Sequence, residues 1–235
     1  MKILAISTAE KESSIALLKD ENPLYEAVWA SKQTHSKRIM DMIALALNRT
    51  SLKVDDLDGF VVAKGPGSFT GLRIGIASVK GLAFAASKPC AGVSSLDGIA
   101  WQFSFVSMPL CVMMDAQRGE VYSAVYNFDH GRLVNKSEEK ALSPIEALGL
   151  LKEETLFAGS GSVVYKELIK TELSKPELNI KANFAPMFQN KVKASALVQQ
   201  ILQNPCLMTQ KDPLTPEYLR KSDAQINKKQ TLTNV

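Results

Sequence analysis

A strand, a polar turn and a second strand open each half of this 235-residue chain, and this repeated order is the strongest constraint on its fold. The first copy lies within residues 1–18, and the second lies within residues 110–128. The two copies match weakly residue by residue, but both place apolar strands on either side of a polar turn. This pattern indicates one architecture that is used twice.

Strands and helices alternate along the rest of the chain, as they do in α/β proteins. The predicted helices are 35–50, 71–87, 164–170 and 194–203, and the other predicted strands are 24–30, 58–63, 90–93 and 155–158. We therefore expect two α/β lobes with mixed sheets and flanking helices. They are an N-terminal lobe at 1–105, a C-terminal lobe at 106–225 whose final helix packs back on the first lobe, and a flexible tail at 226–235.

The composition is that of a soluble globular protein, with 46% hydrophobic and 22% charged residues. The formal net charge of +4 is too small and too evenly spread to indicate a nucleic-acid-binding face by itself. The N-terminus has no signal-peptide pattern, and no apolar run reaches the ~18 residues of a membrane helix. Cys90, Cys111 and Cys206 are well separated in apolar surroundings. We expect buried, reduced thiols in a cytoplasmic protein without a membrane partner.

A glycine-rich loop lies between the strand predicted at 58–63 and the helix predicted at 71–87. The motif residues are Gly65, Pro66, Gly67, Ser68, Phe69, Thr70, Gly71, Arg73 and Gly75. Glycines allow close backbone approach, and free amides at the start of a helix favour anions. The spacing matches neither a nucleotide-binding P-loop nor the dinucleotide fingerprint. The pattern therefore leaves two interpretations open, an anion cradle and a structural turn.

The string from Gly65 to Gly75 resembles the signature of the TsaB (YeaZ-like) family of tRNA threonylcarbamoyladenosine biosynthesis proteins. Supporting matches are Ile3-Leu4-Ala5-Ile6-x-Thr8, His35, Gly92-Val93-Ser94-Ser95-Leu96, Asp115-x-x-Arg118-Gly119-Glu120-Val121-Tyr122 and Pro216-x-Tyr218-Leu219-Arg220. The resemblance covers nearly the whole chain and is weakest between residues 130 and 205. It implies a duplicated two-lobe fold of the actin/Hsp70/sugar-kinase type.

The resemblance also implies a role within an assembly. Its partners would be a TsaD-type catalytic subunit, a TsaE-type ATPase, and tRNA bound by the whole complex. The TsaD-type subunit transfers a threonylcarbamoyl group to adenosine-37 of tRNAs that read codons beginning with A. The TsaB-type chain would scaffold and activate it, and would form a self-dimer when alone. We expect no cofactor of its own, with ATP or ADP at a subunit junction.

The catalytic relative carries two metal-binding histidines four residues apart, and this chain does not. The alignment places Ser95 and Ile99 at those positions, and isoleucine has no donor atom. The two histidines of the chain, His35 and His130, are far apart in sequence. Ser7 stands where most of the family has an acid at the end of the first strand. We therefore predict no catalytic residue and no metal ligand.

The polar turn of the second half contains Asp115, Arg118 and Glu120. We expect Asp115 to stabilise its own turn through backbone amides rather than to act in catalysis. Arg118 and Glu120 would pair across the turn or face a partner. Gly159-Ser160-Gly161-Ser162 resembles a second glycine loop that keeps only a scaffold role.

Both long helices of the first lobe are apolar on more than one face, so each needs a second cover besides the sheet. The second lobe could supply that cover, but we favour a helix-against-helix interface with another protein. The predicted interface residues are His35, Ile39, Met42, Ile43, Ile74, Ser78, Gly81 and Leu82. The alternative functions are an independent small-molecule kinase or hydrolase of the same fold, and a tRNA-binding module.

Overall fold

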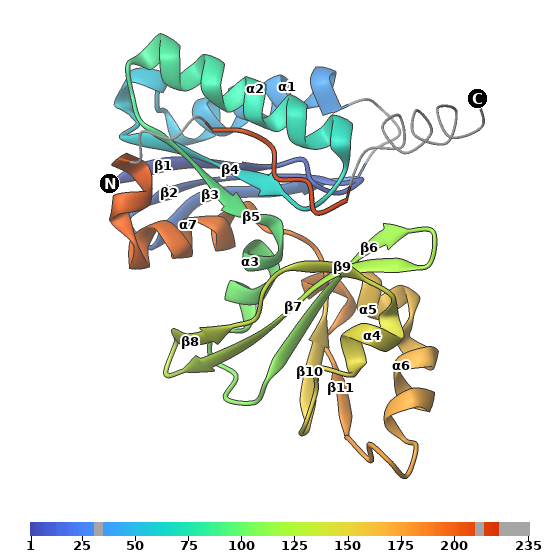
Figure 1. Ribbon diagram of the computed structural model, residues 1–235. Coiled ribbons are helices and arrows are strands. Elements are labelled where there is room, and N and C mark those ends of the chain that lie inside the picture. The colour runs from blue at the N-terminus through green and yellow to red at the C-terminus, as the bar shows by residue number, and fades with distance from the viewer. Residues whose placement is uncertain (31–34, 210–213, 221–235) are drawn as a thin grey trace, which may run out of the picture.

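A mixed sheet forms the centre of each lobe in the computed structural model, which describes residues 1–30, 35–209 and 214–220 (Figure 1). The first sheet has the order β3-β2-β1-β4-β5, and the second has the order β11-β10-β6-β7-β8 with β9 paired to β7. The first comprises β1 (Lys2–Ser7), β2 (Ser13–Lys19), β3 (Asn22–Trp29), β4 (Gly59–Gly65) and β5 (Cys90–Ser94). The second comprises β6 (Leu110–Gln117), β7 (Glu120–Asp129), β8 (Arg132–Lys136), β9 (Lys140–Leu142), β10 (Thr155–Ala158) and β11 (Ala182–Phe184).

The two sheets share one topology. In each, three antiparallel strands follow one another along the chain, and two parallel strands are added beside the first of them. In the second sheet β10 and β11 take the places that β4 and β5 hold in the first. The prediction of a duplicated two-lobe α/β fold with mixed sheets is therefore confirmed.

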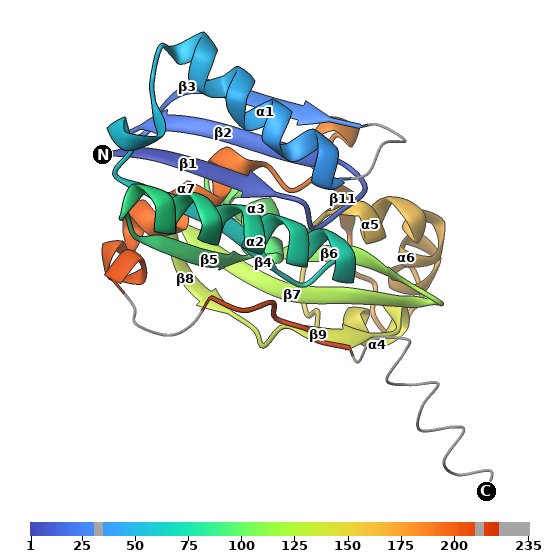
Figure 2. The same cartoon turned by 90° about the horizontal axis from the view of Figure 1, so that it is seen from above.

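Helices form three layers around the sheets. The first sheet is covered on its outer face by α1 (His35–Thr50) and α2 (Phe69–Ala86), which lie side by side (Figure 2). Between the two sheets lie α3 (Ser95–Ala100) and α7 (Ala194–Gln203). The outer face of the second sheet is covered by α4 (Pro144–Leu148), α5 (Ser160–Val164) and α6 (Lys166–Leu173). Short 3₁₀ helices are η1 (Val54–Asp56), η2 (Trp101–Phe103), η3 (Met187–Gln189) and η4 (Pro205–Thr209).

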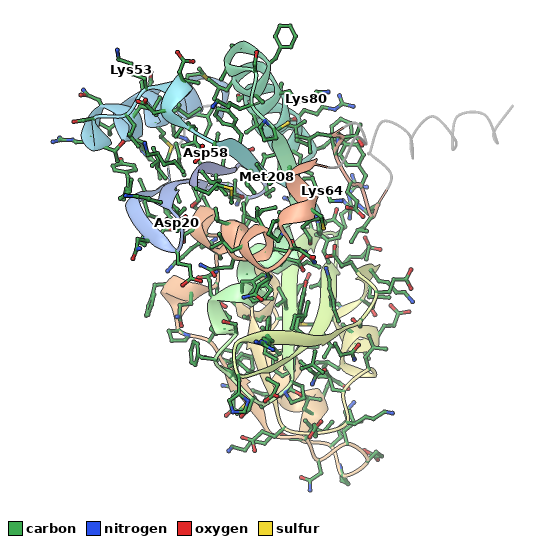
Figure 3. All side chains as sticks on the ribbon, turned by 90° about the vertical axis from the view of Figure 1, so that its left-hand side faces the viewer. Asp20, Lys53, Asp58, Lys64, Lys80 and Met208 are labelled. Atoms are coloured by element: carbon green, nitrogen blue, oxygen red, sulfur yellow. The ribbon has the colours of Figure 1, made fainter. Side chains whose placement is uncertain are left out.

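The three central strands of the first sheet, β1, β2 and β4, are buried on both faces, which explains their nearly continuous apolar sequence, whereas the edge strand β3 is largely exposed. In β1, Leu4 and Ile6 face the α1–α2 layer, whereas Ile3 and Ala5 face the core between the sheets. This core also holds the side of the second sheet that faces the first lobe. Met208 of η4 contributes to it and lies against Gly59 at the start of β4 (Figure 3).

The helix α7 returns to the first lobe although it follows the strands of the second. It contacts β1, β2 and β4 among other elements, and side chains of β2 and β3 accept hydrogen bonds from its first turn. The amide of Ala194 donates to Ser14 Oγ at 2.9 Å, and that of Ser195 donates to Glu26 Oε1 at 3.4 Å. Because the first amides of a helix lack partners within it, these contacts cap α7 from a distant part of the chain.

Two expectations from the sequence are not met in the folded chain: that all three cysteines are buried, and that no segment is long and apolar enough to cross a membrane. Cys111 is buried, and burial raises the pKa of its thiol to about 12, but Cys90 is half-buried and Cys206 is exposed. Among the described residues, α2 alone is long and apolar enough to cross a membrane. It is weak evidence for a membrane span, since α2 packs on the first sheet and core helices meet the same criterion.

The helix α2 approaches the end of β1 closely because glycines face Thr8. A Cβ atom added to Gly71 would lie 2.0 Å from the Thr8 carbonyl oxygen, and one added to Gly75 would lie 2.4 Å from Thr8 Oγ1. The Thr8 hydroxyl donates to the Gly71 carbonyl at 2.7 Å. The first turn of α2 is thereby fixed against the end of the first strand.

A buried ionic network joins the lobes. Asp97 of α3 accepts hydrogen bonds from Lys136 Nζ at 2.7 Å and from the Tyr126 hydroxyl at 2.8 Å, and Lys136 also pairs with Glu139 at 2.6 Å. Burial raises the pKa of Tyr126 and of Glu139. Burial alone would lower the pKa of Lys136, but the two carboxylates hold it above its usual value. The network therefore keeps its ammonium charged at the lobe junction.

Two alanine substitutions within α2 should change stability in opposite directions. Gly71→Ala should lower the free energy of unfolding by roughly 1–3 kcal/mol, because the new methyl group meets a backbone oxygen. Gly81→Ala should raise it by about 0.5–1 kcal/mol, because no atom lies within 4 Å of the added Cβ and alanine favours the helix. Urea unfolding of both variants measures the difference, and equal effects would contradict the packing at Thr8.

Removing the Lys136 ammonium should lower the free energy of unfolding more than removing the ammonium of the more exposed Lys140. Lys136→Met should destabilise the protein by roughly 3 kcal/mol at neutral pH, because Asp97 and Glu139 stay buried without a cation. The loss should shrink on acidification, since the raised pKa of Glu139 lets the folded state take up a proton before the unfolded state does. Lys140→Met, at a half-exposed site, is the control and should change stability by less than about 0.5 kcal/mol.

Candidate functional site

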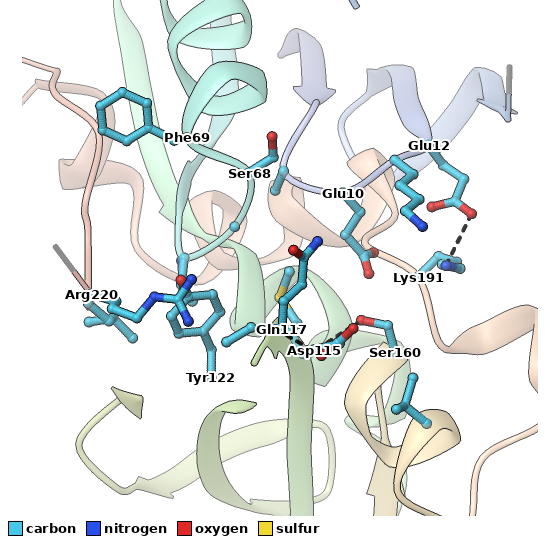
Figure 4. A pocket seen from close by; sticks show the side chains of 18 of the residues that line it. Glu10, Glu12, Ser68, Phe69, Asp115, Gln117, Tyr122, Ser160, Lys191 and Arg220 are labelled. Carbon is cyan, nitrogen blue, oxygen red and sulfur yellow. Dashed lines mark hydrogen bonds and ion pairs between the residues drawn. The ribbon is translucent and has the colours of Figure 1, made fainter. Parts of the chain in front are cut away.

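A cleft of about 1000 Å³ lies between the lobes and gathers segments that are far apart in sequence (Figure 4). Its walls come from both strand–turn–strand units, the glycine loop, α5, the loop around residues 187–191 and residues 217–220. The glycine-loop motif, the second-lobe turn and the C-terminal motif of the sequence thus meet at one place. The duplicated topology explains the meeting, because equivalent turns of the two sheets face each other.

The glycine loop packs against the first hairpin. The Ser68 amide donates to the Ala9 carbonyl at 2.7 Å, and Ser68 Oγ accepts from the Gly71 amide at 3.2 Å as the N-cap of α2. Gly67 has a φ of +154°, and a Cβ there would lie 2.4 Å from the Ala9 oxygen. These amides are engaged within the protein. Of the two interpretations left open by the sequence, the geometry favours the structural turn over the anion cradle.

The C-terminal segment of residues 214–220 runs along the glycine loop. The Glu217 amide donates to the Lys64 carbonyl at 2.7 Å, and the side chains of the same two residues form an ion pair. The Tyr218 ring stacks on Phe69 at 4.6 Å, and its hydroxyl accepts from Arg73 Nε at 3.1 Å. Two motif residues, the half-buried Phe69 and the exposed Arg73, therefore hold this segment. The sequence signalled it only through the resemblance at Pro216-x-Tyr218-Leu219-Arg220.

The second-lobe turn faces the cleft from the opposite side. Asp115 Oδ1 accepts from the Gln117 amide at 2.9 Å, which is the turn-stabilising contact expected for Asp115. Glu120 forms an ion pair with Arg220 at 2.9 Å, so the C-terminal segment links the glycine loop to the second lobe. Arg118 has a φ of +57° in the same turn. Tyr122 and Arg220 also line the cleft (Figure 4).

Two acidic residues of the first turn were missed as site residues. The Glu10 carboxylate projects into the cleft and accepts from the Val192 amide at 3.0 Å (Figure 4). Burial raises its pKa, while the Val192 amide, Lys191 and Ser160 act in the opposite direction. Glu12 pairs with Lys191 at 3.1 Å, and its Oε2 atom is buried without a hydrogen-bond partner in the structure. The signal in the sequence was two acids within one polar turn.

The described residues of the cleft do not form a ready-made metal site. No group of three or more histidine, cysteine, aspartate or glutamate side chains suited to a metal occurs in the described part of the chain. Ser7 at the end of β1 is buried and accepts from the Ala9 amide at 3.4 Å. The carboxylates of Glu10 and Glu12 occupy the first turn, where they would repel phosphate.

The two residues that the sequence resemblance aligns with the relative's metal ligands are inaccessible to solvent. Ser95 and Ile99 lie in α3 and are completely buried in the core between the sheets. His130 is exposed in a turn beside Asp129, far from α3 in sequence. The side chain of His35 lies outside the described residues.

The predicted interface needs a correction on α1. Ile39, Met42 and Ile43 are buried against the first sheet, because α1 directs its regular apolar stripe inward, so these side chains are not available to a partner in the folded chain. Ile74, Ser78 and Leu82 of α2 are half-buried, and Gly81 is exposed. The prediction missed the exposed apolar residues Met40, Leu45, Ala77, Phe84 and Ala85, of which Phe84 is 88% exposed.

Residues 29–228 match the family model described as "TsaD: tRNA N6-adenosine threonylcarbamoyltransferase". The chain is 32% identical over 234 residues to the tRNA threonylcarbamoyladenosine biosynthesis protein TsaB of Bacillus subtilis, and the match covers 96% of each chain. These two similarities extend over both lobes.

Solved structures give the same result. YeaZ from Pseudomonas aeruginosa superposes with a TM-score of 0.75 at 25% identity, covering 93% of this chain and 99% of that one. A ROK family protein from Streptococcus pneumoniae, solved with sucrose, has a TM-score of 0.50 at 11% identity over 87% of this chain and 99% of that one, and shares the fold alone. Taken with the duplicated sheets, these matches show that the chain belongs to the TsaB (YeaZ-like) family of tRNA threonylcarbamoyladenosine biosynthesis proteins.

Proposed function

We propose that the chain is a non-catalytic subunit in the formation of threonylcarbamoyladenosine at adenosine-37 of tRNAs that read codons beginning with A. It scaffolds and activates a TsaD-type catalytic subunit and works with a TsaE-type ATPase. The observation that carries the proposal is the buried pair Ser95 and Ile99, at the positions where the catalytic relative binds its metal. A side chain without a donor atom, enclosed in the core, gives no metal site there.

The partner surface is the outward face of the α1–α2 layer. Ala77, Gly81, Phe84 and Ala85 expose apolar surface on α2, and Met40 extends it on α1. Small residues let a partner helix approach closely, and a Cβ on Gly81 would meet no atom of the chain within 4 Å. An exposed apolar patch of this kind favours association. Because a second copy and a TsaD-type subunit would use the same face, self-pairing and hetero-pairing exclude each other.

The surrounding assembly supplies what this chain lacks. ATP or ADP binds at a junction between subunits, since the cleft of this chain carries acids where a phosphate would sit. The tRNA contacts the complex as a whole, in line with the modest net charge of +4. The proposed location is the cytoplasm.

An independent kinase or hydrolase of the same fold is the alternative function. Its catalysis would require a carboxylate at the end of β1 or a nucleophile activated by a histidine. The first position holds Ser7, and the side chain of His130 is 93% exposed and hydrogen-bonded to Asp129. These features favour the accessory role.

Reconstitution separates the two functions. The purified chain alone should neither transfer a threonylcarbamoyl group to tRNA nor hydrolyse ATP or peptides. Adding it to the TsaD-type and TsaE-type subunits should restore formation of the modified nucleoside, measured by mass spectrometry of digested tRNA. Efficient transfer or hydrolysis by the chain on its own would refute the accessory role.

Charges on the outer face of α2 should prevent assembly without unfolding the chain. The double variant Ala77→Glu with Gly81→Glu places carboxylates on exposed positions, so the isolated fold should keep its unfolding free energy. Desolvating these charges at an apolar contact is costly, so binding to the TsaD-type subunit should weaken at least about 100-fold. Isothermal titration calorimetry measures this affinity.

The control for this experiment is Val134→Glu, which adds a carboxylate at a 67% exposed apolar position of the second lobe. It should bind the catalytic subunit as the unmodified chain does. Retained binding by the α2 double variant, with its circular dichroism unchanged, would place the partner surface elsewhere.

A further inference from the structure

The Glu10 side chain is the feature of the cleft that the proposed function leaves unexplained. It leaves the turn between β1 and β2 and projects into the space between Ser68 of the first lobe and Asp115 of the second (Figure 4). Its side chain is half-buried, and its carboxylate accepts from the Val192 amide at 3.0 Å. An acid in this environment requires partners, since burial of an unpaired charge is strongly unfavourable.

The partners of Glu10 form a set that suits any oxyanion. The Val192 amide precedes α7, a ten-residue helix whose next amides are capped by Ser14 and Glu26. Ser160 of the second lobe, whose hydroxyl oxygen accepts from the Asp115 amide, and Lys191, which pairs with Glu12, line the cleft together with Glu10. An amide, a hydroxyl and an ammonium are the groups that proteins use to hold phosphate or carboxylate oxygens.

The size of the cleft does not exclude a phosphate-bearing ligand. Its volume of about 1000 Å³ is at the upper end of the range for small-molecule sites, which is roughly 300–1000 Å³. The charges exclude it instead. Glu10 and Glu12 stand on one side of the cleft and Asp115 on the other, and the Glu10 carboxylate already accepts from the Val192 amide.

We propose that the Glu10 carboxylate is a built-in anion that fills an oxyanion site of the interlobe cleft and closes it to phosphate-bearing ligands. Removing this carboxylate opens the site to inorganic phosphate and to nucleotide phosphates. In the native chain Glu10 also ties the first hairpin to the segment before α7, so one side chain both joins the lobes and excludes nucleotides. The proposal concerns the chain alone and needs no partner subunit.

Glu10→Ala tests the proposal most directly, because it removes the anion and leaves the Val192 amide, Ser160 and Lys191 in place. Inorganic phosphate and then ADP are titrated into the full chain at constant ionic strength, with calorimetry and the NMR shift of the Val192 amide as readouts. The affinity of the variant for phosphate should exceed that of the unmodified chain by at least about tenfold. Phosphate should also raise its midpoint of thermal unfolding, because a ligand that binds only the folded state stabilises it.

One further variant separates the effect of the Glu10 charge from that of its side-chain volume, and a second controls for the loss of any acidic residue. Glu10→Gln keeps the size of the side chain and an acceptor for the Val192 amide, so its gain in phosphate affinity should be smaller than that of Glu10→Ala. Glu21→Ala removes an exposed acid between β2 and β3, outside the cleft, and should behave as the unmodified chain does.

The proposal is overturned if folded Glu10→Ala gains no affinity for phosphate, since Glu10 would then be only a strut between the lobes. It is also overturned if the unmodified chain binds phosphate or ADP with a shift of the Val192 amide. That second measurement does not depend on whether Glu10→Ala folds, and Glu10→Ser offers another small side chain at the same position. Neither outcome bears on the formation of threonylcarbamoyladenosine by the complex, so the proposed function is tested separately.

Discussion

The apolar core between the two sheets is the constraint on which the rest of the structure depends. It encloses α3 and α7 together with the facing sides of both sheets, so the lobes share this core in addition to the separate core on the outer face of each sheet. Burial of this surface fixes the lobes relative to each other. The polar contacts at the junction are those of Asp97 with Lys136 and of Glu10 with Val192. They form because the lobes are packed in this way, and they favour this relative position of the lobes over others.

Because the two lobes are held in one relative position, they form the cleft and determine which side chains line it. Equivalent turns of the two sheets face each other across it, and the C-terminal segment connects them through Tyr218 and Arg220. In an enzyme of this architecture such turns could hold a phosphate. Here the glycine loop packs on the first hairpin, and the cleft contains acids that are tied to the opposite lobe. The chain keeps the two-lobe fold, and polar contacts that connect the lobes occupy its cleft.

The family and the architecture can be recognised in the sequence. The string around Gly65–Gly75 depends on backbone geometry that only particular residues tolerate, and this specificity makes it a reliable mark of the family. The repeated strand–turn–strand order predicted the duplicated sheets for a similar reason, since side-chain periodicity is local. The contact of Asp115 with its own turn is also local and was correctly predicted.

The tertiary structure alone decided which apolar faces are covered and which distant groups meet. The sequence showed that α1 has several apolar stripes, but only the position of the sheet determined that Ile39, Met42 and Ile43 point inward. Glu10 looked like an ordinary acid of a polar turn, because its partners lie about 180 residues away along the chain. Residue type and spacing fix local conformation, whereas burial and long-range pairing depend on how separate elements pack. The sequence therefore determined the family and the fold, and the packing of the lobes determined the chemistry of the cleft.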